Sequence, residues 1–512
     1  MGLFGFSKQK ESQAHPSGNS ETFESHEQSS SGGYRHTDSQ SDSTPPNNLS
    51  EQDVPLHEAK EKDSQQSQPE ENVANKSSNE SSETIDNEFS VYAPRPGNIE
   101  ETGLSINLLL ELLIKHIYRA GVIDLQQLSK DLSLSGSIVK LLLDEAKQKT
   151  WVENPSSADN GQFRYTLSNI GVLEAEKAFL KRGYLGPAPI PLEQYQRVTQ
   201  IQSNRTQALT EQQMRDGFAD LVFPDEVIGS VGPALNSTKP ILIYGGAGTG
   251  KSYFCRHLNR LFGETVLIPY AIEINNEIIQ VFDPELHHVQ EAASMFNDPT
   301  ISALKIADGY DPRWLACERP LLVTGGELTL SMLEVQFDNA SRCYLPPIQL
   351  KANNGILFLD DLGRQRVTPK ELFNRWILPL EERRDFLALQ NGQHFEIPFE
   401  LLLLFSTNLT PQELIDDAFL RRLGYKIQFQ PLSQKLYEQI WFMECERFEL
   451  ECDSDCFVYL INSLHKTREK PYLACYPRDI LSIVRDQVLF KNLPNRVTKD
   501  LINFAWHSYF VA

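Results

Sequence analysis

One octapeptide in the chain has the residue types and the spacing of a phosphate-binding loop. Residues 245–252 read Gly-Gly-Ala-Gly-Thr-Gly-Lys-Ser and match every fixed position of the pattern G-x-x-x-x-G-K-[ST]. Glycines let a backbone curl so that successive N–H groups point at phosphate oxygens, the lysine supplies a point charge, and the serine hydroxyl can bind Mg²⁺. We therefore predict a nucleoside triphosphate site formed by Gly245, Gly246, Ala247, Gly248, Thr249, Gly250, Lys251 and Ser252.

The segments on either side of this loop have the pattern that a phosphate site needs. The apolar run at 241–244 precedes the loop, and Phe254, Leu258 and Phe262 follow it at helical spacing. A helix that begins at the loop turns the positive end of its dipole towards a bound phosphate. The sequence thus predicts a strand, the loop and a helix in that order.

Two carboxylates follow a second apolar run, at residues 355–359. Asp360 and Asp361 come directly after it, and in a parallel sheet strand ends meet at the same edge. We expect Asp360 to join Ser252 in binding Mg²⁺, and Asp361 to polarise the attacking water.

A third apolar run, at residues 401–405, ends in Ser-Thr-Asn, so that Asn408 follows the strand. Its amide could orient a water molecule or contact the γ-phosphate. The order of loop, acids and amide along the chain predicts ATP hydrolysis. No Asn-Lys-x-Asp guanine-reading pattern occurs, which favours ATP over GTP.

The elements expected around these residues divide the chain into segments of different character. Short buried strands alternate with helices from about residue 192, which is typical of a parallel α/β sheet. Strand signals fade after 430, where helical spacing predicts an all-α lid. Before the sheet, caps at Asp124 and Ser135 and apolar spacing predict three helices followed by two strands, which resembles a winged helix.

The predicted fold class is therefore a P-loop NTPase α/β sheet with a helical lid, preceded by a small winged-helix-like domain and a disordered tail. The expected domains are a disordered acidic Ser-rich tail at 1–98, the winged-helix-like domain at 102–185, a linker at 186–209 stiffened by Pro187, Pro189 and Pro191, the ATPase core at 210–430 and the lid at 431–512.

Charge and cysteine usage exclude some classes of protein. The net charge is −21, and residues 1–100 carry −11 of it, from 18 acidic against 7 basic residues. Phosphate-backbone binding needs clustered Lys and Arg, so a nucleic-acid coat is not expected. The seven cysteines form no disulfide pattern, no apolar run is long enough to cross a bilayer, and no signal peptide is evident, so we expect a cytoplasmic protein.

The motif set resembles the AAA+ ATPases over about residues 210–500. In that resemblance 245–252 corresponds to Walker A, 356–361 to Walker B, and Asn408 to the sensor-1 asparagine. The segment 416–422 looks like the arginine-finger element, with Arg421 or Arg422 as the finger, and Arg478 looks like sensor 2.

Finer features resemble one branch of that family. Residues 386–397 alternate in period two around Asn391-Gly392, which resembles the pre-sensor-1 β-hairpin of the branch that includes the MoxR-like ATPases. The segments at 269–271, 325–328 and 360–365 look like an uncharacterised bacterial subgroup. The resemblance implies ATP and Mg²⁺ as ligands, a homo-oligomeric and commonly hexameric ring, an arginine finger that acts in trans, and a protein client.

Two positions depart from the family pattern. AAA+ proteins usually have Glu as the second Walker B acid, whereas this chain has Asp361, whose carboxylate reaches one methylene less far. This predicts slow turnover or a different water geometry. Walker A contains Gly-Ala-Gly-Thr at 246–249 where many relatives have prolines, which changes loop stiffness more than chemistry.

The sequence thus predicts a Mg²⁺-dependent ATPase that remodels or assembles a partner. Two hypotheses from other classes remain open. A nucleotide-gated scaffold would bind ATP tightly with little turnover. A DNA-binding regulator would use the third helix of the winged-helix-like domain. That helix offers lysines at 140, 147 and 149 beside acidic residues, and it has no arginine to read guanine.

Overall fold

The computed structural model of the 512-residue chain describes residues 89–154, 164–203, 208–237, 239–263, 265–290, 309–414 and 416–510. Most of the predicted disordered tail lies outside the described residues, as does much of the loop between the two predicted strands of the winged helix. The predicted end of the tail at residue 98 lies too far along the chain, because Phe89 and Ala93 are buried in a hydrophobic cluster.

The centre of the fold is a parallel sheet, as the sequence predicts. Its five strands lie in the order β10-β13-β16-β5-β17, and every neighbouring pair is parallel. Strand β16 therefore separates β5 from β13. The bounds of the strands are Ile241–Tyr244 for β5, Leu321–Thr324 for β10, Ile356–Leu359 for β13, Leu402–Thr407 for β16 and Tyr425–Gln428 for β17.

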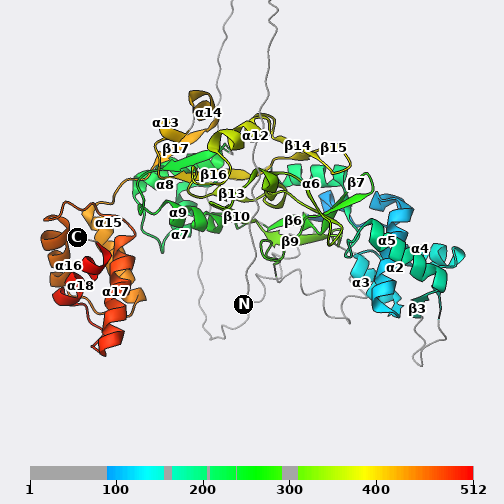
Figure 1. Cartoon of the computed structure of the whole chain (residues 1–512), viewed down its shortest axis with the longest axis horizontal. Coiled ribbons are helices and arrows are strands. Elements are labelled where there is room, and N and C mark those ends of the chain that lie inside the picture. Colours follow the sequence, from blue (N-terminus) through cyan, green and yellow to red (C-terminus); the bar gives the residue numbers. More distant parts are fainter. Residues whose placement is uncertain are drawn as a thin grey trace, which may run out of the picture. The chain divides into compact units, whose positions relative to one another are not determined.

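Helices cover both faces of this sheet, because successive side chains of a strand point to opposite faces. On β5, Ile241 and Ile243 pack with one cluster, while Leu242 packs with the other. The first cluster includes side chains of α7, α8 and α9, and the second includes side chains of α12 and α14. Figure 1 labels these helices around the sheet. These helices span Glu211–Gly217, Asp225–Asn236, Lys251–His257, Pro369–Glu382 and Asp417–Arg422.

A second sheet, which the sequence analysis does not predict, contains residues of the expected linker. Pro187, Pro189 and Pro191 do not lie in a free spacer, because Ile190–Pro191 forms β4 and Leu192–Ser203 forms α6. Residue Ile190 is fully buried and pairs with Ile272 of β7. The order of this sheet is β11-β12-β8-β7-β4, with β7 at Ala271–Ile274, β8 at Glu277–Gln280, β11 at Gln336–Asp338 and β12 at Cys343–Leu345; β6, at Thr265–Pro269, pairs separately with β9, at Trp314–Glu318.

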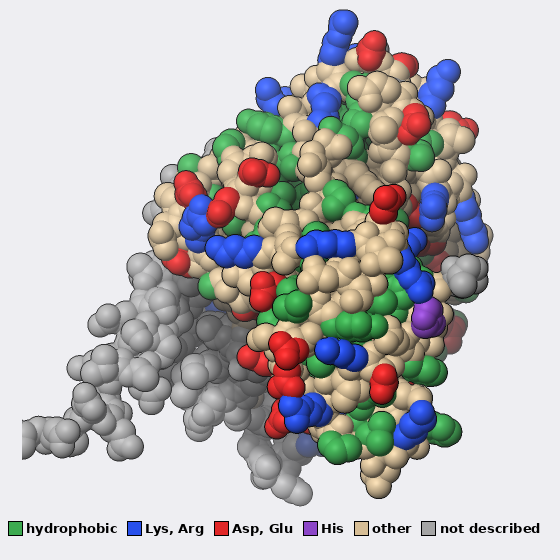
Figure 2. Space-filling view, turned by 90° about the vertical axis from the view of Figure 1, so that its left-hand side faces the viewer, with side chains coloured by type: hydrophobic (Ala, Val, Ile, Leu, Met, Phe, Trp, Pro, Cys, Tyr) green, Lys and Arg blue, Asp and Glu red, His purple; other side chains and the backbone are tan. Residues whose placement is uncertain are grey.

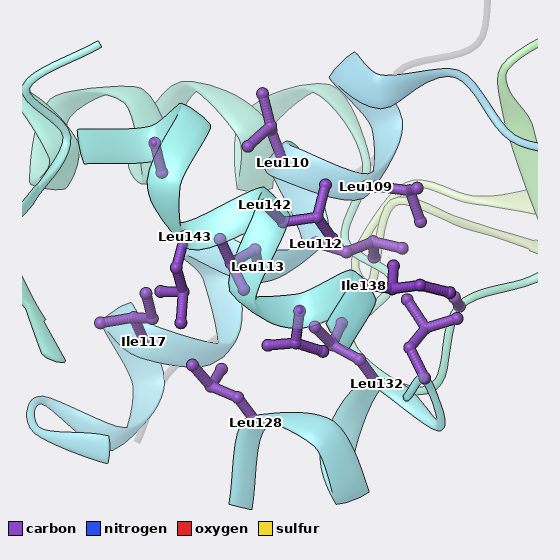
Figure 3. Close-up of a cluster of buried hydrophobic side chains, with 14 of the residues drawn as sticks. Leu109, Leu110, Leu112, Leu113, Ile117, Leu128, Leu132, Ile138, Leu142 and Leu143 are labelled. Atoms are coloured by element: carbon purple, nitrogen blue, oxygen red, sulfur yellow. The ribbon is translucent and has the colours of Figure 1, made fainter. Parts of the chain in front are cut away.

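The N-terminal module contains the three helices and two strands predicted for a winged helix, and it adds a third strand at Ile123–Asp124 and a fourth helix at Asn169–Lys181. The side chains of Asp124 and Ser135 cap α3 and α4 as expected. Leucines from α2, α3 and α4 point into one cluster (Figure 3), so the apolar spacing of these segments marks their buried faces. The elements are α2 at Ile106–Ala120, β1 at Ile123–Asp124, α3 at Leu125–Leu132, α4 at Gly136–Gln148, β2 at Val152–Glu153, β3 at Arg164–Leu167 and α5 at Asn169–Lys181.

The predicted hairpin is present as β14, at Arg384–Ala388, and β15, at His394–Pro398, which pair antiparallel. Gly392 has a φ of 82°, and its N–H donates to the Leu389 carbonyl, so the tip is a three-residue loop rather than a two-residue turn. Leu387 and Ile397 lie in the same cluster as the second sheet. One face of the hairpin is therefore packed rather than free.

The C-terminal region is helical, as predicted. Its helices are α15 at Gln434–Arg447, α16 at Ser454–Tyr459, α17 at Tyr476–Lys491 and α18 at Lys499–Tyr509, and a π-helical turn follows α16 at Leu460–His465. They enclose a core of their own, in which Tyr437, Trp441 and Trp506 are fully buried. Within the described part of the chain, none of the helices has the length and apolar character to cross a membrane.

A buried ion pair ties several distant segments together. The side chains of Asp311 and Arg313 are fully buried, and their closest contact, between Oδ2 and Nη2, is 2.7 Å. The Arg313 guanidinium also donates to the carbonyls of Thr102 and Pro189 at 2.9 and 3.1 Å. This one guanidinium thus donates hydrogen bonds to backbone carbonyls of the N-terminal module and of the segment that leads into β4.

Replacing Asp311 by alanine should leave a buried, unpaired guanidinium and cost about 3–5 kcal/mol of stability. We expect the midpoint of thermal unfolding, followed by circular dichroism, to fall clearly. The control is Asp225→Ala, which removes an exposed ion pair with Arg215. Equal midpoints for the two variants would contradict this role of the buried pair.

Candidate nucleotide-binding site

The glycine loop, residues 245–252, joins β5 to α9 in the predicted strand–loop–helix order. At two positions of the loop, neighbouring atoms lie so close that only glycine fits. A Cβ on Gly245 would lie 2.1 Å from the Phe429 carbonyl oxygen, and one on Gly248 would lie 2.6 Å from the Cys475 Sγ. The φ of Gly248 is also 80°, which favours glycine. The loop thus fits closely between the end of β17 and the start of α17.

Lys251 occupies the centre of the site. The residue is only 6% exposed, and its Nζ donates to the carbonyls of Gly245 and Gly246 at 2.9 and 2.8 Å and to the Asn408 Oδ1 at 2.8 Å. Burial lowers the pKa of Lys251, and the nearby carboxylates of Asp360 and Asp361 act in the opposite direction. The ammonium is therefore held by three oxygen acceptors.

The carboxylate of Asp360 is fixed by donors from three elements. Its Oδ1 accepts from the Ser252 hydroxyl at 2.7 Å, from the Ser406 hydroxyl at 2.6 Å and from the Asp361 N–H at 3.1 Å. Arg256 lies 3.7 Å from Oδ2. A serine hydroxyl and a carboxylate side by side are the oxygen ligands that Mg²⁺ takes in proteins, so this donor set fits the ion.

Asp361 and Asn408 are joined as the strand order requires. The Asn408 Nδ2 donates to the Asp361 Oδ1 at 2.8 Å, and Arg364 lies 3.2 Å from the other oxygen. Because β16 lies between β13 and β5, Asn408 stands between Asp361 and Lys251 and bonds to both. The result is one hydrogen-bonded chain from ammonium to amide to carboxylate. Asp361 itself has a φ of 54°, in the left-handed region.

These groups line a pocket of about 470 Å³. Its walls come from the glycine loop, the strand ends, the segment at 221–224, and the helices α15 and α17. The lining residues are Leu221, Val222, Phe223, Pro224, Val227, Ala247, Gly248, Thr249, Gly250, Lys251, Ser252, Tyr253, Asp360, Asp361, Ser406, Asn408, Phe429, Gln430, Leu432, Ile440, Met443, Glu444, Arg447, Ala474, Cys475, Arg478 and Asp479.

The three arginines predicted from the resemblance lie in different surroundings. Arg478 is exposed and lines the pocket from α17. Neither Arg421 nor Arg422 lines it. Arg422 is paired with Glu381 at 2.7 Å, whereas Arg421 is exposed and has no hydrogen-bond or ion-pair partner among the described residues.

Several residues of the site escape the sequence analysis. Ser406 precedes the predicted Asn408 by two positions, so alternation on β16 could have pointed to it. Glu444 and Arg447 lie on α15, which carries no motif. Cys475 contacts the loop through its backbone, because its N–H donates to the Gly248 carbonyl at 3.2 Å. Sequence spacing gives no signal for such a contact between distant segments.

Comparison with known proteins gives limited matches. A family model described as "Domain of unknown function (DUF8689)" matches residues 433–508, which are the helical C-terminal region. No curated protein matches. Among solved structures, the RuvB Holliday junction branch migration motor of Thermotoga maritima has a TM-score of 0.32 and 15% identity, covering 58% of this chain and 73% of its own.

Two further solved structures are similar at the same level. A point mutant of Thermotoga maritima RuvB has a TM-score of 0.33 and 11% identity, covering 57% of this chain and 72% of its own. NtrX from Brucella abortus has a TM-score of 0.33 and 11% identity, covering 65% of this chain and 60% of its own. With scores near one third, these likenesses are too partial to transfer an activity.

The close fit around Gly248 leads to a test within the loop itself. We expect Gly248→Ala to weaken nucleotide binding strongly, because the added methyl meets Cys475 and the backbone is left-handed. Gly246→Ala is the matched control, since its Cβ would have no neighbour nearer than 4.0 Å and its φ is not positive. Titration with a fluorescent ATP analogue measures both, and equal affinities would show that the contact with Cys475 does not shape the site.

Proposed function

We propose that this protein is an ATP-binding and ATP-hydrolysing AAA+ ATPase that depends on Mg²⁺. The observation that carries the proposal is the hydrogen-bonded chain Lys251–Asn408–Asp361, with Ser252 and Asp360 beside it, inside one pocket. This set supports the binding of a triphosphate, the placing of a divalent cation and the orientation of a water molecule.

Binding of the triphosphate would use the loop and its lysine. Backbone N–H groups at the start of α9 and the positive end of the helix dipole favour anionic oxygens. Lys251 is already bound to the Asn408 amide oxygen, so the ammonium can move from that oxygen to a phosphate without crossing open solvent. Arg478, which lines the pocket, adds a second positive charge from α17.

Mg²⁺ would be held by Ser252 and Asp360. When bound, the ion supplies neutralisation of the charge on the β- and γ-phosphates. Ser406 has a separate task, because its hydroxyl donates to the Asp360 Oδ1 at 2.6 Å and would keep that carboxylate in place with the metal bound.

Asp361 would accept the proton of the attacking water, and Asn408 would hold the carboxylate in position. The side chain of Asp361 is shorter than the usual glutamate, so its reach depends on the backbone. The left-handed conformation at this residue sets the direction of the side chain. We therefore propose that this backbone conformation, together with Arg364, tunes the rate of turnover.

The AAA+ assignment, the MoxR-like branch and the ring are part of the same proposal. The motif order, the exposed Arg421 and the position of Arg478 support them, and Arg421 is the better finger because Arg422 is bound to Glu381. In a homo-oligomeric ring, proposed to be hexameric, Arg421 of one protomer would reach the γ-phosphate of its neighbour. The hairpin β14–β15 would transmit hydrolysis to a protein client together with the sheet on which it packs.

The charges do not favour nucleic acid as the partner. Lys147 of α4 is paired with Asp144, and Lys149, directly after the helix, is paired with Glu145. The face that Figure 2 turns to the viewer mixes basic and acidic side chains instead of gathering one sign. A cytoplasmic location is proposed on the seven free cysteines, which form no disulfide.

The ATPase proposal is tested by phosphate release from purified full-length protein with Mg²⁺ and ATP. We expect turnover by the parent, loss of nucleotide binding in Lys251→Ala, and retained binding with turnover reduced about 10²–10⁴-fold in Asp361→Asn. ATP binding by the parent without any phosphate release would favour the scaffold hypothesis. No binding at all would refute the proposal.

The trans finger is tested by mixing two inactive variants. Arg421→Ala should lower turnover about a thousandfold or more with binding intact, and Arg422→Ala serves as its control because that side chain is already paired. Mixed with Lys251→Ala, which still carries Arg421, the Arg421→Ala protein should regain part of its activity. A mixture as inactive as its components would show that Arg421 does not act between protomers.

A further inference from the structure

We infer that Glu444 of α15 recognises the nucleobase by accepting a hydrogen bond from the exocyclic amino group of adenine. This inference deepens the proposed function and rests on it, because it assigns the base-reading group of the same pocket. It also gives a role to part of the region matched by the domain of unknown function.

The first observation is a buried carboxylate with few hydrogen-bond partners. Glu444 is 7% exposed, and its only hydrogen-bonding partner among the described side chains is Arg447, at 3.4 and 3.5 Å from the two oxygens. The Arg447 side chain is itself 59% exposed. Buried charges normally have close partners, since removing them from water is costly. The Glu444 carboxylate therefore has capacity for a further donor.

The second observation is the direction of the helix face. Ile440, Met443, Glu444 and Arg447 follow the spacing i, i+3, i+4, i+7 and all line the pocket. One face of α15 thus forms a pocket wall that is apolar except for the acid and its arginine. Val222 and Leu432, which also line the pocket, pack with the hydrophobic cluster of the same helices.

Electrostatics then places the nucleotide's uncharged end against this wall. In the proposed function Lys251 and Ser252 hold the phosphate end, with Asp360 acting through Mg²⁺, and a carboxylate that no cation bridges to the triphosphate would repel it. The purine faces are apolar and match Ile440 and Met443, whereas the 6-amino group is a donor that needs an acceptor in such surroundings. Glu444 is the acceptor on this face.

The test compares ATP with purine riboside triphosphate, which differs by the absence of the 6-amino group. Dissociation constants are measured with full-length protein carrying Asp361→Asn, so that turnover does not interfere. We expect that background to bind ATP about tenfold or more tightly than the analogue, as for a charge-assisted hydrogen bond. Adding Glu444→Ala should bring the ratio close to one by weakening ATP alone.

Two further variants keep the result interpretable. Glu446→Ala is the matched control, because that acid is exposed on the same helix and does not line the pocket. Glu444→Gln keeps the side-chain volume and a weaker acceptor, so it should give an intermediate ratio even if the alanine variant folds poorly.

The outcomes separate this inference from the proposed function. An unchanged ratio in Glu444→Ala would overturn the inference and leave the ATPase proposal intact. If Glu444→Ala loses a preference for ATP over 2′-deoxy-ATP but keeps the preference for the 6-amino group, the carboxylate contacts the ribose instead. That result would also overturn the inference. Failure of the background protein to bind either triphosphate would refute the proposed function itself.

Discussion

The burial of one ammonium group constrains the rest of the site. Lys251 is almost wholly removed from water, so its charge must be met by oxygens, and it is met by two carbonyls of its own loop and by the amide of Asn408. The carbonyls are available only because the glycine loop curls back over the side chain. The amide is available only because β16 lies beside β5 in the sheet. Sheet order and loop conformation are thus both linked to the same charge.

The same arrangement links the charge to the groups proposed for chemistry. Asn408 uses its oxygen for Lys251 and its nitrogen for Asp361, so a movement of the lysine towards phosphate would free the amide oxygen and alter its hold on the carboxylate. Asp360 is fixed independently by Ser406. Residues of α15 and α17 line the pocket, and the hydrogen bond from the Cys475 N–H to the Gly248 carbonyl joins the start of α17 to the loop. The loop and the start of α17 are therefore in direct contact.

The local patterns in the sequence predicted most of the parallel sheet and the phosphate end of the site, because each of those elements has a signal within its own residues. The strand at 241–244, the glycine loop and the capped helices are examples. The second sheet was missed because β4 is two residues long and its partner lies far along the chain. The tail boundary was wrong because Phe89 is buried by contacts that no local pattern encodes. Glu444 and Cys475 were missed for the same reason, since only the packing of the C-terminal helices brings them to the pocket.

The most direct test of the account is an experimental structure of the Asp361→Asn protein with Mg²⁺ and ATP. We predict that the Lys251 Nζ leaves the Asn408 Oδ1 for a phosphate oxygen, that Ser252 and Asp360 lie at the metal, and that the purine lies against the face of α15. A structure in which Lys251 keeps its bond to Asn408 while the triphosphate lies elsewhere would contradict it.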